Sequence, residues 1–270
     1  MEPDTTERFL EFLPGGFTRI TGGGTRNQVR LLPNSLDIPE GTACPFETRP
    51  QEEVNVAGLP EGWRVLKNIY TPHLNHRLVI PPTCWSKHDL QVLGGTHLME
   101  TLYALSLTIA EDSFEAACFT HIGRAGGQNL QHHHWHAMRV LVRKPLELED
   151  FTVAMKPDRI VTQNESFVTF AGGARAGECL IVPNRKICFR ESLEEIGAAI
   201  LHIVNLGNEK FSNPSFMVTI RVSSHGILRY IDYCPILNFW GSPEYITAPL
   251  EGGPITIPHT HELTAQTLRE

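Results

Sequence analysis

The sequence lacks paired cysteines, an excess of basic residues and a long apolar run. Its six cysteines, at positions 44, 84, 118, 179, 188 and 234, have no close partners, which predicts reduced thiols rather than a disulfide framework. Acidic residues outnumber basic ones by 30 to 23, and the net charge of −7 argues against a nucleic-acid surface. No apolar run approaches the roughly 20 residues that span a bilayer, and the polar, acidic start is unlike a secretory signal. We therefore expect a cytoplasmic protein that binds neither nucleic acid nor a membrane.

The most informative feature is a run of histidines at positions 132, 133, 134 and 136, interrupted by Trp135. In a strand, side chains alternate, so His132, His134 and His136 would share one face. A glycine-rich loop at residues 123–129 precedes the run. Its backbone N–H groups suit phosphate oxygens, while a neutral imidazole can attack phosphorus. Metal binding and incidental surface histidines remain open alternatives, whereas a purification tag would be terminal.

A faint internal repeat indicates how the 270 residues are organised. The first half predicts strands at 63–68 and 78–81, a helix at 89–110, a strand at 114–119 and the histidine strand. The second half predicts strands at 159–164 and 180–183, then a helix with a Ser192/Glu195 capping box and a stop at Gly207, then strands at 216–222 and 227–231. This pattern predicts an α+β fold, with an antiparallel sheet and helices packed on it. We expect a catalytic half at residues 1–145 and a degenerate half at 146–270, where only His225 falls near the place of the triplet.

The glycine and histidine spacing resembles the galactose-1-phosphate uridylyltransferase branch of the histidine-triad superfamily. That family's pattern is Asn-x-Gly-x-x-x-Gly-x-Ser-x-x-His-x-His-x-Gln. The positions of this chain in the same register are His121, Gly123, Gly127, Asn129, His132, His134 and His136. Residues 44–47 resemble the family's Cys-Pro-Phe-Cys segment, and further landmarks run to the tail at residues 262–269. The resemblance covers nearly the whole chain and implies two tandem histidine-triad-like half-domains.

The resemblance implies that His134 is the nucleophile of a nucleotidyltransferase or phosphorylase. It would attack the α-phosphorus of a nucleotide-sugar and hold the nucleotide until a phosphate-bearing acceptor collects it. His136 would donate to a phosphate oxygen where the family pattern has glutamine, and histidine there is the pattern of the hydrolytic and phosphorylase branches. The alternative is therefore a hydrolase of nucleotide conjugates or dinucleoside polyphosphates. The implied substrate-binding residues are Asn68, Gly126, Gly127, Gln128, Asn129, Arg26, Arg30 and Glu244.

Many relatives carry a structural zinc on a Cys-x-x-Cys pair and two histidines. The corresponding set in this chain is Cys44, Glu47, Cys84 and His132. Thiolate, carboxylate and imidazole groups are all zinc ligands. The alternative is that Cys44 and Cys84 are small buried residues without a metal. In the family the late loop containing Glu244 serves the neighbouring subunit, so the resemblance also implies a homodimer.

Overall fold

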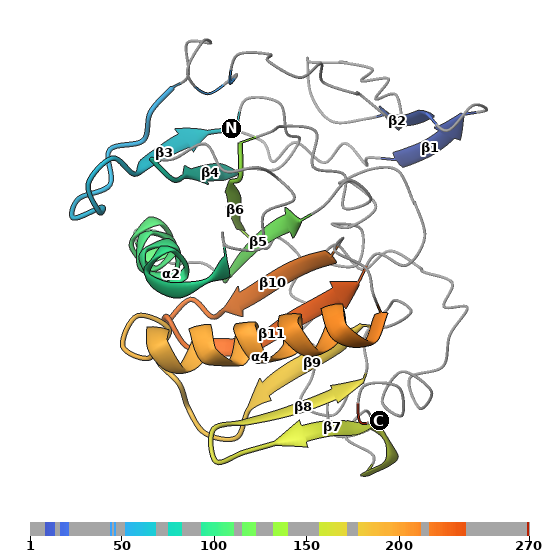
Figure 1. The fold of residues 1–270 in the computed structure, drawn as a ribbon. Helices are drawn as coiled ribbons and strands as arrows, with labels where there is room; N and C mark the ends of the chain where they lie inside the picture. The colour runs from blue at the N-terminus through green and yellow to red at the C-terminus, as the bar shows by residue number, and fades with distance from the viewer. Residues whose placement is uncertain are drawn as a thin grey trace.

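A nine-stranded antiparallel sheet unites both halves of the chain in the computed structural model (Figure 1). The structure describes residues 9–13, 17–21, 44, 46, 52–68, 75–82, 93–110, 115–122, 132–139, 157–171, 178–211, 216–235 and 269. The strand order is β3-β4-β6-β5-β10-β11-β9-β8-β7. These strands are β3 (Arg64–Lys67), β4 (Arg77–Ile80), β5 (Ala116–Ile122), β6 (Trp135–Arg139), β7 (Ile160–Gln163), β8 (Phe167–Ala171), β9 (Cys179–Pro183), β10 (Phe216–Val222) and β11 (Leu228–Pro235). A separate hairpin pairs β1 (Phe9–Leu13) with β2 (Phe17–Thr21).

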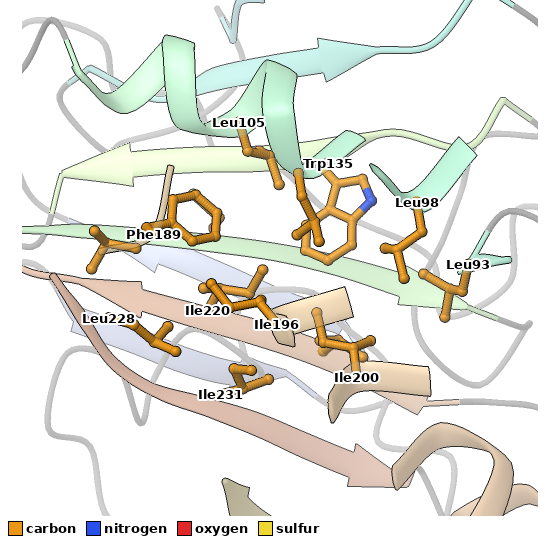
Figure 2. Close-up of a cluster of buried hydrophobic side chains, with 14 of the residues drawn as sticks. Leu93, Leu98, Leu105, Trp135, Phe189, Ile196, Ile200, Ile220, Leu228 and Ile231 are labelled. Atoms are coloured by element: carbon orange, nitrogen blue, oxygen red, sulfur yellow. The ribbon is translucent and has the colours of Figure 1, made fainter. Parts of the chain in front are cut away.

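Two helices, α2 (Gly95–Ala110) and α4 (Leu193–Phe211), pack against the sheet and against each other. Leu98 and Leu105 of α2 meet Ile196 and Ile200 of α4 over the sheet, where Trp135 is fully buried (Figure 2). Spacings of four and seven residues put these side chains on one face of each helix, so each helix buries an apolar stripe. Among the described residues, neither helix is long and apolar enough to cross a bilayer.

The predicted α+β class is confirmed, with an antiparallel sheet and helices packed on it. The second half differs from its predicted plan, because three strands rather than two precede its helix. The strand that was not predicted is β8, which follows β7 after a tight turn. There the Asn164 side-chain oxygen accepts hydrogen bonds from the backbone of Ser166 (2.9 Å) and Phe167 (2.8 Å). The hairpin of β1 and β2 was not predicted either.

The helix α4 begins after Ser192 as predicted, but it does not stop at Gly207. The Ser192 carbonyl accepts the first helical bond, from the backbone of Ile196 (3.0 Å). Gly207 lies well inside the helix, where an added Cβ would overlap the hydroxyl and ring of Tyr233 on β11. The glycine therefore serves close packing of helix on sheet rather than a left-handed turn. The prediction of a stop at Gly207 was wrong for this reason.

The order of strands repeats about the centre of the sheet, where β5 pairs with β10. Moving outwards, the first half runs β5, β6, β4, β3, and the second half runs β10, β11, β9, β8. In each half the helix connects the third strand from the centre to the central strand, and β7 is an additional edge strand. The division into a catalytic half at 1–145 and a degenerate half at 146–270 stays a prediction.

Candidate active site

His134 lies just before β6, and its ring is bonded to the backbone of His132. Its Nδ1 lies 2.9 Å from the carbonyl oxygen of His132. A carbonyl only accepts, so Nδ1 carries the proton and Nε2 carries the lone pair. The side chain is 8% exposed, and burial lowers the pKa of His134 to about 4, although the bond to the His132 carbonyl acts in the opposite direction. The ring is therefore a neutral imidazole at pH 7, with Nε2 as a nucleophilic nitrogen.

His136 is the second residue of β6 and lies between β4 and β5. Its backbone is paired with Leu78 on one side and with Phe119 on the other. The imidazole stacks parallel to the Phe119 ring, with centroids 4.5 Å apart. The His134 and His136 ring centroids are 4.8 Å apart, so the two imidazoles predicted to act together are adjacent. The ring of His121, in the place of the motif's asparagine, meets His136 edge-on at 5.8 Å.

A third imidazole, that of His76, is bonded to His136. His76 immediately precedes β4, and its Nε2 lies 2.8 Å from Nδ1 of His136. The Asn68 side-chain nitrogen lies 3.4 Å from Nδ1 of His76, and the backbone N–H of Asn68 donates to the His76 carbonyl (2.9 Å). Sequence reasoning gave Asn68 a substrate role and missed His76. No local sequence signal could have found it, because the contact depends on the pairing of β4 with β6, which puts Leu78, two residues after His76, opposite His136.

The back of the site is a buried threonine–histidine pair. The Thr120 hydroxyl donates to the His134 carbonyl (2.9 Å), so it accepts from Nε2–H of His133 (3.0 Å). Burial and the neighbouring imidazoles lower the pKa of His133 well below its usual value. His133 thus faces away from His134 and His136, as strand alternation predicts. The regular strand itself begins only at Trp135, so the prediction that the whole histidine run is strand was wrong.

His132 and Cys44 form the described part of the predicted zinc site. The Cys44 Sγ lies 3.1 Å from Nδ1 of His132, and Nε2 of His132 lies 3.2 Å from the Pro81 carbonyl. Phe46 places its ring edge-on to both His132 and His134, at 5.4 and 5.3 Å. In the described part of the chain, no group of three or more histidine, cysteine or acidic side chains is placed to hold a metal ion. Glu47 and Cys84, the other two predicted ligands, lie outside the described residues.

The remaining predicted substrate-binding residues also lie outside the described residues, so their roles stay predictions. They are Gly126, Gly127, Gln128 and Asn129 of the glycine-rich loop, together with Arg26, Arg30 and Glu244. The described residues bring together five of the predicted positions: Asn68, His132, His134, His136 and Cys44.

The second half carries different chemistry at the corresponding positions. Phe119 pairs with Thr219 at the middle of β5 and β10. In the first half Phe119 also pairs with His136, and in the second half Thr219 also pairs with Asp232. Asp232 therefore occupies the place of His136, and Tyr230, two residues earlier, occupies that of His134. His225 lies in the turn between β10 and β11, not at the place of the triplet.

Comparisons with known proteins find the same fold in several solved enzymes. The ADP-glucose phosphorylase of Arabidopsis thaliana, with bound ADP-glucose, aligns over 98% of this chain and 99% of its own, at 18% identity and a TM-score of 0.59. A uridylyltransferase aligns over 97% and 98%, at 16% identity and a TM-score of 0.58. The yeast Ap4A phosphorylase in complex with Ap4A aligns over 87% and 74%, at 13% identity and a TM-score of 0.52. No model of a known protein family matches the sequence, and no curated protein matches it.

These likenesses show that the chain has the fold of the uridylyltransferase and of the two phosphorylases. The resemblance inferred from the histidine and glycine spacing is confirmed at the level of the fold.

Proposed function

We propose that the protein is a nucleotidyltransferase or phosphorylase that works through a covalent nucleotidyl group on His134. The observation that carries the proposal is the bond from Nδ1–H of His134 to the carbonyl of His132. It fixes the ring with the lone pair on Nε2, and burial keeps that ring neutral. The ring centroid of His136 lies 4.8 Å from that of His134, so His136 can donate a hydrogen bond to an oxygen of the same phosphoryl group.

The first step follows from this arrangement. The Nε2 lone pair of His134 attacks the α-phosphorus, a P–N bond forms, and the P–O bond to the leaving phosphate breaks. The leaving group departs with the electron pair as a phosphate anion, which needs no proton near pH 7 because its second pKa is about 6. Positive charge grows on the imidazole as the bond forms, and the His132 carbonyl stabilises it at Nδ1. In the second step an acceptor oxygen attacks phosphorus, and the P–N electron pair returns to His134.

Two structural neighbours indicate the class of donor to test. One is an ADP-glucose phosphorylase with bound ADP-glucose, and another is an Ap4A phosphorylase in complex with Ap4A. We therefore propose a nucleotide-sugar or a dinucleoside polyphosphate as donor. The N–H groups of residues 126–129, with Arg26 and Arg30, would bind the phosphates, and Glu244 would bind a sugar hydroxyl. These roles rest on the motif resemblance.

Product analysis tests the proposal and separates transfer from hydrolysis. The protein is incubated with a panel of nucleotide-sugars and dinucleoside polyphosphates, with inorganic phosphate or a sugar 1-phosphate as acceptor. With a nucleotide-sugar as donor, a nucleoside diphosphate formed with phosphate indicates a phosphorylase, and exchange of sugars indicates a transferase. A nucleoside monophosphate formed in either mixture would instead favour the hydrolase, to which the histidine at position 136 also points. His134→Gln should abolish every product, and turnover unchanged in this variant would contradict the proposed nucleophile.

The spacing between Cys44 and His132 supports our proposal of a structural zinc ion. In a tetrahedral site with zinc–ligand bonds of about 2.3 Å to sulfur and 2.0 Å to nitrogen, the two ligand atoms lie about 3.5 Å apart. The Cys44 Sγ and His132 Nδ1 are 3.1 Å apart, and the backbone carbonyl at Nε2 of His132 leaves Nδ1 as the ligating nitrogen. We propose that Cys44, His132, Glu47 and Cys84 hold zinc and that the ion fixes the chain before His134. We also propose a cytoplasmic homodimer, from the resemblance.

Metal analysis of the purified protein tests this site. We expect about one zinc per chain, lost in Cys44→Ser and kept in the control Cys188→Ser, whose thiol lies in the second half. Absence of zinc from the wild-type protein, or full zinc content in Cys44→Ser, would contradict the proposal.

A further inference from the structure

Three side chains from different parts of the first half form one hydrogen-bonded series. Asn68 follows β3, His76 precedes β4, and His136 lies in β6. The side-chain nitrogen of Asn68 lies 3.4 Å from Nδ1 of His76, and Nε2 of His76 lies 2.8 Å from Nδ1 of His136. His76 is 6% exposed, and Asn75 before it adopts a left-handed backbone, with φ at 53°. The turn and the ladder bond from Asn68 to the His76 carbonyl together fix the position of the ring.

The series has one consistent arrangement of protons. An amide nitrogen only donates, so Nδ1 of His76 accepts from Asn68 and the proton of the neutral ring is on Nε2. Nε2–H of His76 then donates to Nδ1 of His136. A neutral imidazole with an accepting Nδ1 must carry its proton on Nε2. His136 therefore presents an Nε2–H donor, while His134 presents an Nε2 lone pair because its Nδ1 donates to a carbonyl.

We infer that His76 is a positioning residue that sets the tautomer of His136 and so makes this imidazole a hydrogen-bond donor to the phosphoryl group. The inference rests on the proposed function and assigns to Asn68 the role of orienting His76. An imidazole at position 136 can donate or accept at Nε2, and an N–H donor at its Nδ1 fixes it as a donor. An accepting Nε2 would face phosphoryl oxygens lone pair to lone pair, which is repulsive. A glutamine amide would need no such partner, because its nitrogen always donates.

Three other described groups near His136 do not supply this information. Phe119 stacks on the ring and has no polar atom, and the Nδ1–H of His134 is bonded to the His132 carbonyl. His121 meets the ring edge-on at 5.8 Å between centroids, beyond a direct hydrogen-bonding arrangement of the two rings. The bond from Nε2–H of His76 is a short polar contact of His136 Nδ1, at 2.8 Å.

A double-mutant cycle on the rate of nucleotidyl transfer tests the inference. His76→Phe keeps an aromatic ring beside Phe119 but removes the donor, and we expect kcat to fall about 10- to 100-fold with little change in KM. His76→Gln keeps an N–H near the place of Nε2 and should restore most of the rate. In a His136→Gln background, His76→Phe should change the rate by no more than about twofold, because no tautomer remains to be set. Equal losses in both backgrounds would overturn the inference.

Two-bond ¹H–¹⁵N spectra of imidazole-labelled protein give a readout that does not depend on activity. We expect the Nε2–H tautomer for His136 in the wild-type protein and a mixture of tautomers in His76→Phe. His97→Phe, a change of a half-buried imidazole on α2, should leave the His136 signals unchanged. An Nδ1–H tautomer of His136 in the wild-type protein would overturn the inference even if His76→Phe fails to fold. If the tautomer responds to His76 but no nucleotide is transferred, the proposed function fails and the positioning of His136 stands.

Discussion

Lowering the pH from 7 to 5 should destabilise this protein, and a substitution at His134 should reveal how much of the loss is due to this residue. The pKa of His134 is about 4 in the folded protein because the ring is buried, whereas an unfolded histidine has a pKa of about 6.5. Between these values the unfolded state binds the extra proton, so stability is full above pH 6.5 and falls as the pH drops towards 4. From these two pKa values, the loss due to His134 at pH 5 is about 2 kcal/mol.

Urea unfolding at the two pH values measures this loss. The wild-type protein should lose about 2 kcal/mol more between pH 7 and pH 5 than His134→Gln does, because the glutamine does not titrate. Carboxylates titrate in both proteins and cancel in the comparison. His133, whose pKa His134 helps to lower, adds a further contribution of the same sign. The control is His225→Gln, at an exposed position in a turn of the second half, which removes a histidine away from the site. Equal losses in wild type and His134→Gln would refute the burial of a neutral imidazole at this site.

Three further outcomes follow from the structure. At pH 5.5 the rate of nucleotidyl-adduct formation should still be about 90% or more of its plateau value, because His134 stays neutral, whereas an ordinary histidine would be only about 10% neutral. A steep fall of this rate below pH 6.5, in stopped-flow or quench measurements, would contradict the low pKa of His134. Gly207→Ala should lower the melting temperature, because the new methyl group overlaps Tyr233. Such overpacking costs about 1–3 kcal/mol, against a gain of about 1 kcal/mol in helix propensity. A higher melting temperature would show that the helix can move off the sheet. Thr120→Val should lower the free energy of unfolding by about 2 kcal/mol or more and slow adduct formation, because it leaves the His134 carbonyl and the His133 ring nitrogen without their hydrogen bonds to the hydroxyl. Unchanged stability by urea unfolding would count against the buried pair.

The sequence predicted most strands of the first half and the start of α4 because their signals are local. The strand β10 has the predicted bounds, and α4 begins after Ser192. The strand β8 was missed although its residues suit a strand, because a repeat with two strands before each helix was assumed and β7 took the place of β8. Gly207 was assigned to a helix end because its contact with Tyr233 comes from a strand distant in sequence.

The candidate site was predictable where the histidines are consecutive and not where they come from another strand. His134 and His136 are two residues apart, so alternation alone puts their rings together. His76 is 60 residues from His136 and reaches it only through the pairing of β4 with β6. Such a register depends on the whole sheet, and no local pattern near His76 reports it. The tautomers of the two imidazoles likewise follow from their bonded partners and not from the residue types.

Intact mass of the protein after brief mixing with the panel of nucleotide-sugars and dinucleoside polyphosphates tests the central claim most directly. The proposed mechanism predicts a mass gain of one nucleoside monophosphate unit with at least one donor, lost on later addition of phosphate or sugar 1-phosphate and absent in His134→Gln. The size of the gain would also identify the base. Turnover of a donor with no adduct at any time, or an adduct that persists in His134→Gln, would contradict the claim that His134 is the nucleophile.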